Sequence, residues 1–300
     1  MSSEDNIRKL VTFGIRSYTF ENLHLEEPAM KSRSTTRTWR TLVTVLFWAY
    51  ALLNTYFVFT PWLGEAPAWA YLLVPLLLGG FSLSHAIYKL GLRHALTFLA
   101  LVAFISLAFE AVGVATGAVY GPYRYTHKLG PQVFGVPLVV PFSWFMVIYP
   151  SYALANYLAD GRVVSRPRPG LARLIGLAAL SAMLMTAWDL AVDPQMVMYG
   201  HWVWHVEGAY FGIPVQNFIG WLATTLTIYL AYRMLESRFP PRPWGAASPT
   251  FDRLPLIIYA LFASGYAVGY ALLGRPALAL VAFFAMGTPC LAALLRTKGA

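Results

Sequence analysis

The stretch Trp188–Pro214 reads WDLAVDPQMVMYGHWVWHVEGAYFGIP and follows directly on an apolar run. It holds two aspartates, a glutamate and two histidines among many aromatic residues, and no Lys or Arg occurs between Arg173 and Arg233. Carboxyl groups within an apolar segment are expensive and usually have a partner or a function. What these acids do therefore depends on the fold that surrounds them.

The rest of the chain is too apolar for a soluble domain. Of its 300 residues, 58% are hydrophobic and 12% are charged, about half the charge of a typical soluble domain. Its apolar segments approach the roughly 20 residues that a helix needs to cross a bilayer. We therefore predict an all-α polytopic membrane protein with about eight transmembrane helices, near 41–63, 67–88, 95–118, 137–158, 174–192, 213–232, 255–273 and 276–295.

The basic residues predict how these helices are oriented. With eight spans, 19 of the 22 Lys and Arg residues fall on one side, and only Arg124, Lys128 and Arg275 fall on the other. Loops rich in Lys and Arg face the cytoplasm. We expect a cell-membrane protein with both termini cytoplasmic, comprising a tail (residues 1–38) and a single transmembrane domain (residues 39–300). The net charge of +9 is thus a topology signal, and we expect no nucleic acid as a partner.

Cysteine and histidine offer little for a metal or redox centre. Cys290 is the single cysteine, which excludes an intramolecular disulfide and a CxxC site. His201 and His205 have the spacing of a metal pair on a helix, but Gly200 precedes them in a segment that we interpret as a loop. We therefore expect no metal site.

An internal repeat relates two parts of the sequence. A Tyr-Gly pair begins ten residues after Glu110 and again ten residues after Asp189. The motifs FGVP and FGIP come next, and each is followed, seven residues past its proline, by a tryptophan. The repeat units, about 95–158 and 174–232, each predict a helix, an aromatic outer loop and a helix that starts at proline. Spans three–four and five–six thus form a parallel two-helix repeat.

The repeat gives Glu110 and Asp189 equivalent positions, toward the outer ends of their helices. Around a pseudo-twofold axis the two carboxyls would face each other or a shared cavity, with Asp193 one helical turn beyond Asp189. Two close carboxyls without a cation cannot easily both ionise, so one is expected to stay protonated. We predict that Glu110, Asp189 and Asp193 are catalytic. A structural role in capping a helix end stays open, above all for Asp193.

Aromatic residues are concentrated around these acids on the same side of the membrane. Aromatic faces can line a slot for a long apolar ligand and can stabilise a cation beside it. The predicted substrate-binding residues are Tyr120, Tyr123, Trp144, Trp188, Tyr199, Trp202, Trp204, Glu207, Phe211, Asn217 and Trp221.

Three classes of function use carboxyls of this kind. An enzyme would protonate an isolated carbon–carbon double bond to a tertiary carbocation, which water or an internal alkene captures or which loses a proton. A prenyltransferase would use the DxxxD spacing of Asp189 and Asp193 for magnesium diphosphate, but a second motif is missing and the acids lie on the outer side. A proton-coupled transporter also has repeats and membrane carboxyls, although here the acids lie toward one side rather than at the midplane.

Four runs carry a resemblance to a known family: FEAVGVATGAVYGPYRY, FGVPLVVPFSW, WDLAVDPQ and YFGIPVQNFIGW. They resemble the bacterial and archaeal carotenoid-biosynthesis membrane family that contains γ-carotene 1′,2′-hydratase and bisanhydrobacterioruberin hydratase. The resemblance covers roughly residues 40–295 and is most specific over 109–221.

This resemblance implies a hydratase, a hydro-lyase without a redox cofactor. It would add water across the terminal double bond of an acyclic ψ end group, as in γ-carotene or lycopene, and leave a tertiary hydroxyl. Its partners would be an acyclic or monocyclic carotenoid, water and membrane lipid, and association with other enzymes of the pathway stays open. The family's acids correspond to Glu110, Asp189 and Asp193. A lycopene-cyclase-like isomerase that uses the same cation is the nearest alternative, followed by a proton-coupled lipid transporter.

Overall fold

The computed structural model describes residues 33–63, 68–246 and 248–298 and confirms an all-α polytopic membrane protein. Most of the predicted tail therefore lies outside the described residues, and its last six residues already belong to the first described helix. The long helices are α2 (Arg33–Leu63), α3 (Ala68–Leu90), α4 (Leu92–Thr116), α5 (Val139–Asp160), α6 (Leu171–Met198), α7 (Val215–Arg238) and α9 (Leu254–Leu272). The last helical stretch consists of α10 (Pro276–Ala282), a π-helical turn η3 (Phe283–Gly287) and α11 (Thr288–Lys298).

Short elements connect these helices. The loop after α4 contains β1 (Tyr123–Tyr125), η2 (His127–Leu129), β2 (Gln132–Val133) and β3 (Val136–Pro137). The loop after α6 contains β4 (Trp202–Trp204), and α8 (Pro249–Asp252) precedes α9.

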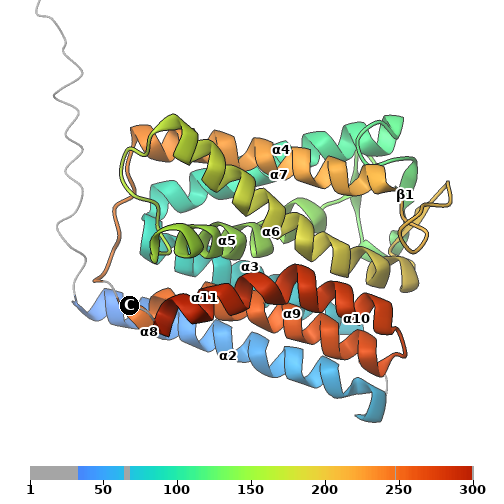
Figure 1. Cartoon of the computed structure of the whole chain (residues 1–300), viewed down its shortest axis with the longest axis horizontal. Coiled ribbons are helices and arrows are strands. Elements are labelled where there is room, and N and C mark those ends of the chain that lie inside the picture. The colour runs from blue at the N-terminus through green and yellow to red at the C-terminus, as the bar shows by residue number, and fades with distance from the viewer. Residues whose placement is uncertain (1–32, 64–67, 247, 299–300) are drawn as a thin grey trace, which may run out of the picture. The chain divides into compact units, whose positions relative to one another are not determined.

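Seven helical segments in the described part of the chain are long and apolar enough to cross a membrane. The helix α5 is not one of these seven segments, although it has 22 residues. It packs against α3, α4, α6 and α9, between the other helices (Figure 1). Every residue from Trp144 to Tyr157 is buried. A helix enclosed by other helices needs no apolar surface toward lipid, which explains how α5 accommodates Tyr, Ser and Asn.

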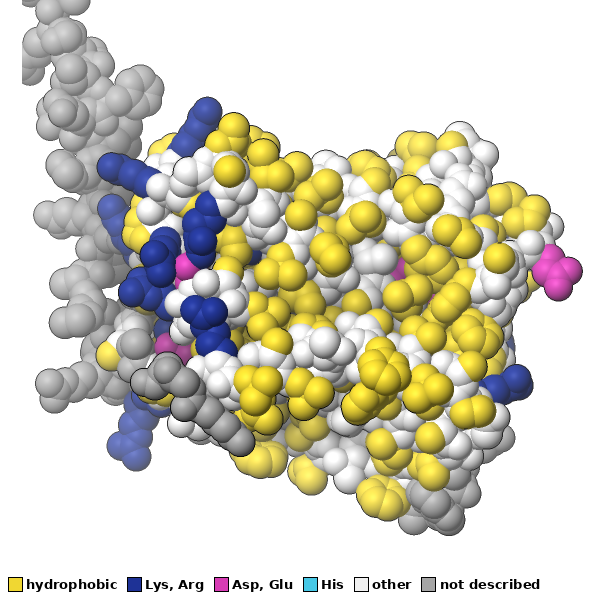
Figure 2. Space-filling model, in the orientation of Figure 1, with side chains coloured by type: hydrophobic (Ala, Val, Ile, Leu, Met, Phe, Trp, Pro, Cys, Tyr) yellow, Lys and Arg dark blue, Asp and Glu magenta, His cyan; other side chains and the backbone are white. Residues whose placement is uncertain are grey.

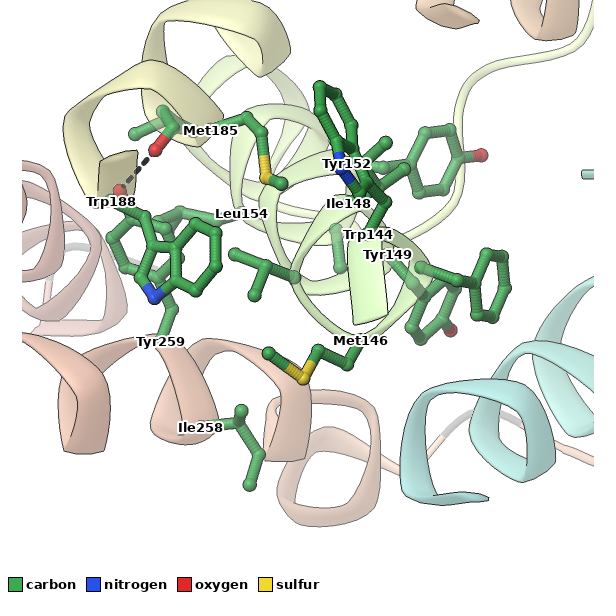
Figure 3. Packing of buried hydrophobic residues seen from close by; sticks show 14 of the residues in the cluster. Trp144, Met146, Ile148, Tyr149, Tyr152, Leu154, Met185, Trp188, Ile258 and Tyr259 are labelled. Atoms are coloured by element: carbon green, nitrogen blue, oxygen red, sulfur yellow. Dashed lines mark hydrogen bonds between the residues drawn. The ribbon is translucent and has the colours of Figure 1, made fainter. Parts of the chain in front are cut away.

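The packing around α5 is dominated by large side chains (Figure 3). Trp144, Tyr149 and Tyr152 of α5 lie in one cluster with Trp188 of α6 and Tyr259 of α9. Burial of aromatic side chains of this size is a major contribution to packing energy. The core therefore lies on the same helices that carry the predicted acids.

Lys and Arg side chains gather at one end of the helices, and hydrophobic side chains cover the middle (Figure 2). The loops around β1 lie at the opposite end (Figure 1). Arg233, which was counted with the charges of the Lys- and Arg-rich end, belongs to α7 and is only 2% exposed. The uneven distribution of Lys and Arg between the two ends does not depend on Arg233.

The repeat is visible in the backbone and in the packing. Trp144 and Trp221, the equivalent tryptophans, stack on each other with ring centroids 4.1 Å apart and planes 5° apart. The equivalent residues Phe134 and Phe211 share a positive φ, 54° and 51°, which is uncommon for side chains other than glycine, asparagine and aspartate. Two copies of one unit therefore meet around a pseudo-twofold axis.

The loops after α4 and α6, one from each unit, also pair with each other. β1 and β4 are antiparallel, and their central pair is Arg124 opposite Val203, which are equivalent residues of the repeat. An antiparallel pair centred on equivalent residues is the arrangement that a twofold axis produces. In the bundle, α4 packs against α5 and α7, and α6 packs against α7 and α5.

Two prolines inside helices leave carbonyls that other helices or loops satisfy. Proline has no N–H and removes the hydrogen bond to the carbonyl four residues before it. For Pro150 this is the carbonyl of Met146, which accepts from Ser82 Oγ at 3.0 Å. For Pro194 it is the carbonyl of Leu190, which accepts from the hydroxyl of Tyr210 at 2.8 Å. Hydroxyl groups thus replace the missing donors where water is excluded.

This replacement predicts a coupling between Ser82 and Pro150. Ser82→Ala should lower the free energy of unfolding by about 1–3 kcal/mol, because a buried carbonyl loses its donor. In a Pro150→Ala background the new N–H can bond to Met146, so the same change should cost less. Thermal unfolding of the four proteins in one detergent measures this coupling.

Ser264→Ala is the matched control, because Ser264 is exposed and bonds within its own helix. An equal loss from Ser82→Ala in both backgrounds would show that the hydroxyl does not substitute for the helical donor.

Candidate active site

Glu110 lies in the last two turns of α4 and is 3% exposed. Strand β1 follows shortly after, and side chains two residues apart in a strand point to the same face. Tyr123 and Tyr125 therefore both reach Glu110: each hydroxyl donates to its Oε2 atom, Tyr125 at 2.9 Å. The indole N–H of Trp144 on α5 donates to the same carboxyl.

Burial and the neighbouring Glu110 raise the pKa of the Tyr123 and Tyr125 hydroxyls well above the usual value. Both phenols therefore stay protonated, and Glu110 accepts their hydrogen bonds.

Asp189 and Asp193 form a second group, on one face of α6. Both are buried, with 0% and 2% of their surface exposed. Asn217, in the first turn of α7, connects them: its Nδ2 donates to Asp189 Oδ2 at 3.1 Å and to Asp193 Oδ2 at 2.5 Å. The other oxygen of Asp189, Oδ1, is buried and accepts no hydrogen bond, and the carboxyls of Asp189 and Asp193 are hydrogen-bond partners of each other.

Tyr120 lies between these two groups. Its hydroxyl forms a hydrogen bond of 2.9 Å with Thr224 of α7. Burial, and then the charges of Glu110, Asp189 and Asp193, raise the pKa of the Tyr120 hydroxyl well above its usual value. All three acids thus lie within electrostatic reach of one side chain.

Glycines make room for the ring of Tyr120. A Cβ at Gly113 on α4 would lie 2.7 Å from the ring, and a Cβ at Gly220 on α7 would lie 2.7 Å from its other edge. Tyr120 is therefore inserted between two helices that have no side chains at the contact. This insertion brings the loop of the first unit against a helix of the second.

Tryptophans connect the two acidic groups as well. Trp144, which bonds Glu110, stacks on Trp221, and Trp221 meets Trp188 edge-on with centroids 5.9 Å apart. Trp188 immediately precedes Asp189 in α6. An aromatic layer thus runs from one acidic group to the other.

The remaining predicted residues lie farther out. Trp204 and Trp202 of β4 pack on Tyr123 and Tyr125, with centroids 5.0 and 5.7 Å apart, so they support the tyrosines rather than contact the acids. Three others have exposed side chains in the loop after α6, and their substrate-binding role stays a prediction: Tyr199, Glu207 and Phe211.

Several polar partners of the acids and of their neighbours were not among the predicted site residues. Tyr125 was detectable, because it shares the alternation of β1 with Tyr123. Thr224 gave no signal, because a threonine in an apolar helix is common. The burial of Arg233 was hidden too: it bonds Asn156, its repeat equivalent, at 2.9 Å and Ser181 at 2.9 Å, and lies over the ring of Tyr152. This second polar cluster joins α5, α6 and α7.

Within residues 33–63, 68–246 and 248–298, no group of three or more His, Cys, Asp or Glu side chains is arranged to hold a metal ion. His201 and His205 flank strand β4 rather than share a helix face.

Comparison with known proteins finds a matching family and a similar protein. A family described as carotenoid biosynthesis protein matches residues 70–289. The chain is 34% identical over 137 residues to a protein of Haloarcula japonica named bisanhydrobacterioruberin hydratase. That match covers 45% of this chain and 44% of the relative, so the chain spans less than half of the relative's length. No solved structure matches the chain.

The insertion of Tyr120 predicts the effect of Gly220→Ala. The new Cβ would lie 2.5 Å from the carbonyl oxygen of Val119 and against the Tyr120 ring. We expect a loss of about 1–3 kcal/mol in the free energy of unfolding, as for other overpacked cores. Gly176→Ala on α6 is the control, because nothing lies within 4 Å of its Cβ, and it should be neutral or stabilising. Equal thermal stability of the two variants would contradict the tight contact.

Proposed function

We propose that this chain, which belongs to the carotenoid biosynthesis protein family, is a carotenoid hydratase. Its substrate would be an acyclic or monocyclic carotenoid with a ψ end group, of the γ-carotene or lycopene type. The relative's name supports hydration as the reaction class. The single observation that carries the proposal is that acids of both repeat units are buried within electrostatic reach of Tyr120, with stacked tryptophans between the two acidic groups.

The electrostatics of this place favour acid catalysis. In the described part of the chain, the acids in ion pairs are Asp160, Glu236 and Asp252, and none of the three site carboxyls is among them. Two neighbouring carboxyls that lack a cation hold at least one proton more readily than two charges. The site can therefore keep a carboxylic acid next to an apolar substrate.

The proposed reaction begins with proton transfer from a carboxyl to the less substituted carbon of the terminal double bond. The π electrons form the new C–H bond, and the positive charge appears on the carbon that bears two methyl groups. A carboxylate and the faces of Trp144 and Trp221 would stabilise this cation where it develops.

Water then completes the addition. Its oxygen bonds to the cationic carbon, and a carboxylate accepts the released proton as general base. One water molecule is added, no electrons are exchanged with a cofactor, and the site regains its protons.

We also propose that the basic end of the helices faces the cytoplasm, with both termini there and the acids toward the outer side. The gathering of Lys and Arg at one end supports this orientation (Figure 2).

Single cysteines in a Cys290→Ala background test the orientation. Ala209→Cys, in the exposed outer loop, should react with a membrane-impermeant maleimide on intact cells. Pro167→Cys, exposed in the loop between α5 and α6, should react only after lysis. The opposite pattern would invert the topology.

The reaction is tested in a bacterial host that makes lycopene or γ-carotene and has no hydratase of its own. The wild-type chain should yield a product heavier by one water, and growth in ¹⁸O-labelled water should place the label in its hydroxyl. Glu110→Gln and Asp189→Asn should each lower conversion by about 10²–10⁴-fold, the range of general acid–base catalysis.

Asp252→Asn is the matched control, because it makes the same chemical change in an ion pair with Lys89 at the other end of the helices. It should retain conversion at equal protein level. A cyclised product of unchanged mass would instead identify an isomerase, and a wild-type chain that leaves the carotenoid unchanged would refute the hydratase.

A further inference from the structure

The two acidic groups differ in a way that assigns them different tasks. We infer that Asp189 delivers the proton from its Oδ1 atom, whereas Glu110 acts as a carboxylate that Tyr123 and Tyr125 hold in position. The inference rests on the proposed hydration, and it adds roles for individual atoms and names the two tyrosines as positioning residues.

Glu110 is surrounded by donors. Two phenol hydroxyls converge on its Oε2 atom, and an indole N–H donates to the same carboxyl. Hydrogen bonds to an ionised acceptor are about twice as strong as those between neutral groups. A protonated Glu110 would have to donate its own hydrogen to one of the two phenol oxygens, and the hydrogen bond from that phenol to the carboxyl would be lost. The surroundings therefore favour the carboxylate.

Asp189 has the opposite surroundings. Its Oδ2 atom accepts from Asn217, but Oδ1 is buried with no donor. A buried charged oxygen without a donor is more expensive than a neutral one. A hydrogen on Asp189 is shared with the Asp193 carboxyl in the resting site, and a π bond, which accepts weakly, can replace that acceptor when substrate is bound. Asp193 then holds the negative charge of the pair and shares the Asn217 amide.

The duplicated units have diverged at the positions that create this difference. Val114 stands where the second unit has Asp193, and Val140 stands where it has Asn217. Conversely, the second unit has tryptophans at the positions of Tyr123 and Tyr125. The phenol pair thus belongs to one unit and the Asp–Asn arrangement to the other, so the axis relates two acids with unlike partners.

The assigned steps balance. The Asp189 O–H bond breaks as the C–H bond forms, which leaves a cation on carbon and a carboxylate on Asp189. Water adds to the cation, and its surplus proton goes to Glu110. Transfer of that proton from Glu110 to Asp189 through a second water molecule restores the starting state.

Infrared difference spectra of the full chain, purified in lipid, test the protonation states without substrate. Asp189→Asn should remove the C=O stretch of a protonated carboxyl, and Glu110→Gln should remove a carboxylate stretch. Tyr123→Phe and Tyr125→Phe should shift the carboxylate stretch alone. Tyr259→Phe is the control: its buried hydroxyl bonds the backbone carbonyl of Leu184, and both stretches should stay in place. The reverse assignment of the two acids would overturn the inference, whether or not the chain hydrates carotenoids.

Deuterium transfer tests the roles during the reaction. In D₂O, Glu110→Gln should still protonate the substrate reversibly, so recovered carotenoid gains deuterium although little hydrated product forms. Asp189→Asn should leave recovered carotenoid unlabelled, with at least about 10²-fold less exchange. Labelling by Asp189→Asn but not by Glu110→Gln would exchange the two roles. If the wild-type chain forms no hydrated product, the proposed function fails, and the infrared result still decides the assignment.

Discussion

A polar group inside a membrane has to find its partner within the protein, because hydrocarbon offers no hydrogen bond. This constraint organises the helices around α5. The carbonyls freed by Pro150 and Pro194 accept from hydroxyls of other segments. Arg233 bonds side chains of two neighbouring helices and lies over an aromatic ring. Each polar group thus joins helices that apolar contacts alone would leave free to slide.

The acids depart from this pattern in an informative way. Glu110 has more donors than a structural carboxyl needs, whereas Asp189 retains a buried oxygen without any. Buried polar networks that are only partly satisfied are unfavourable and tend to mark function. The aromatic layer through Trp144 and Trp221 keeps both acids in one low-dielectric environment, where charge interactions are stronger than in water.

The sequence predicted the membrane class, the positions of the helices and the repeat. These features follow from local sequence signals, which can be recognised without coordinates: apolar runs, the positions of Pro and Gly, and duplicated motifs. The enclosure of α5 by other helices was not predictable. Hydropathy reflects the composition of a segment and does not show whether neighbouring helices surround it. Arg233 was misplaced for a related reason: counting charges assumes that each one reaches water. Of the site, the acids and Tyr123 followed from pattern, whereas Thr224 depends on which helix faces Tyr120.

The pairing of β1 with β4 has a consequence for any attempt to recombine this chain with a relative. The two strands come from different repeat units, yet each fixes the register of the other. A one-residue change in the length of either loop would turn the paired side chains to the opposite face, including the tyrosines that hold Glu110. A crossover between the units would join loops that no longer match. The two paired loops therefore have to be exchanged together, as one structural unit.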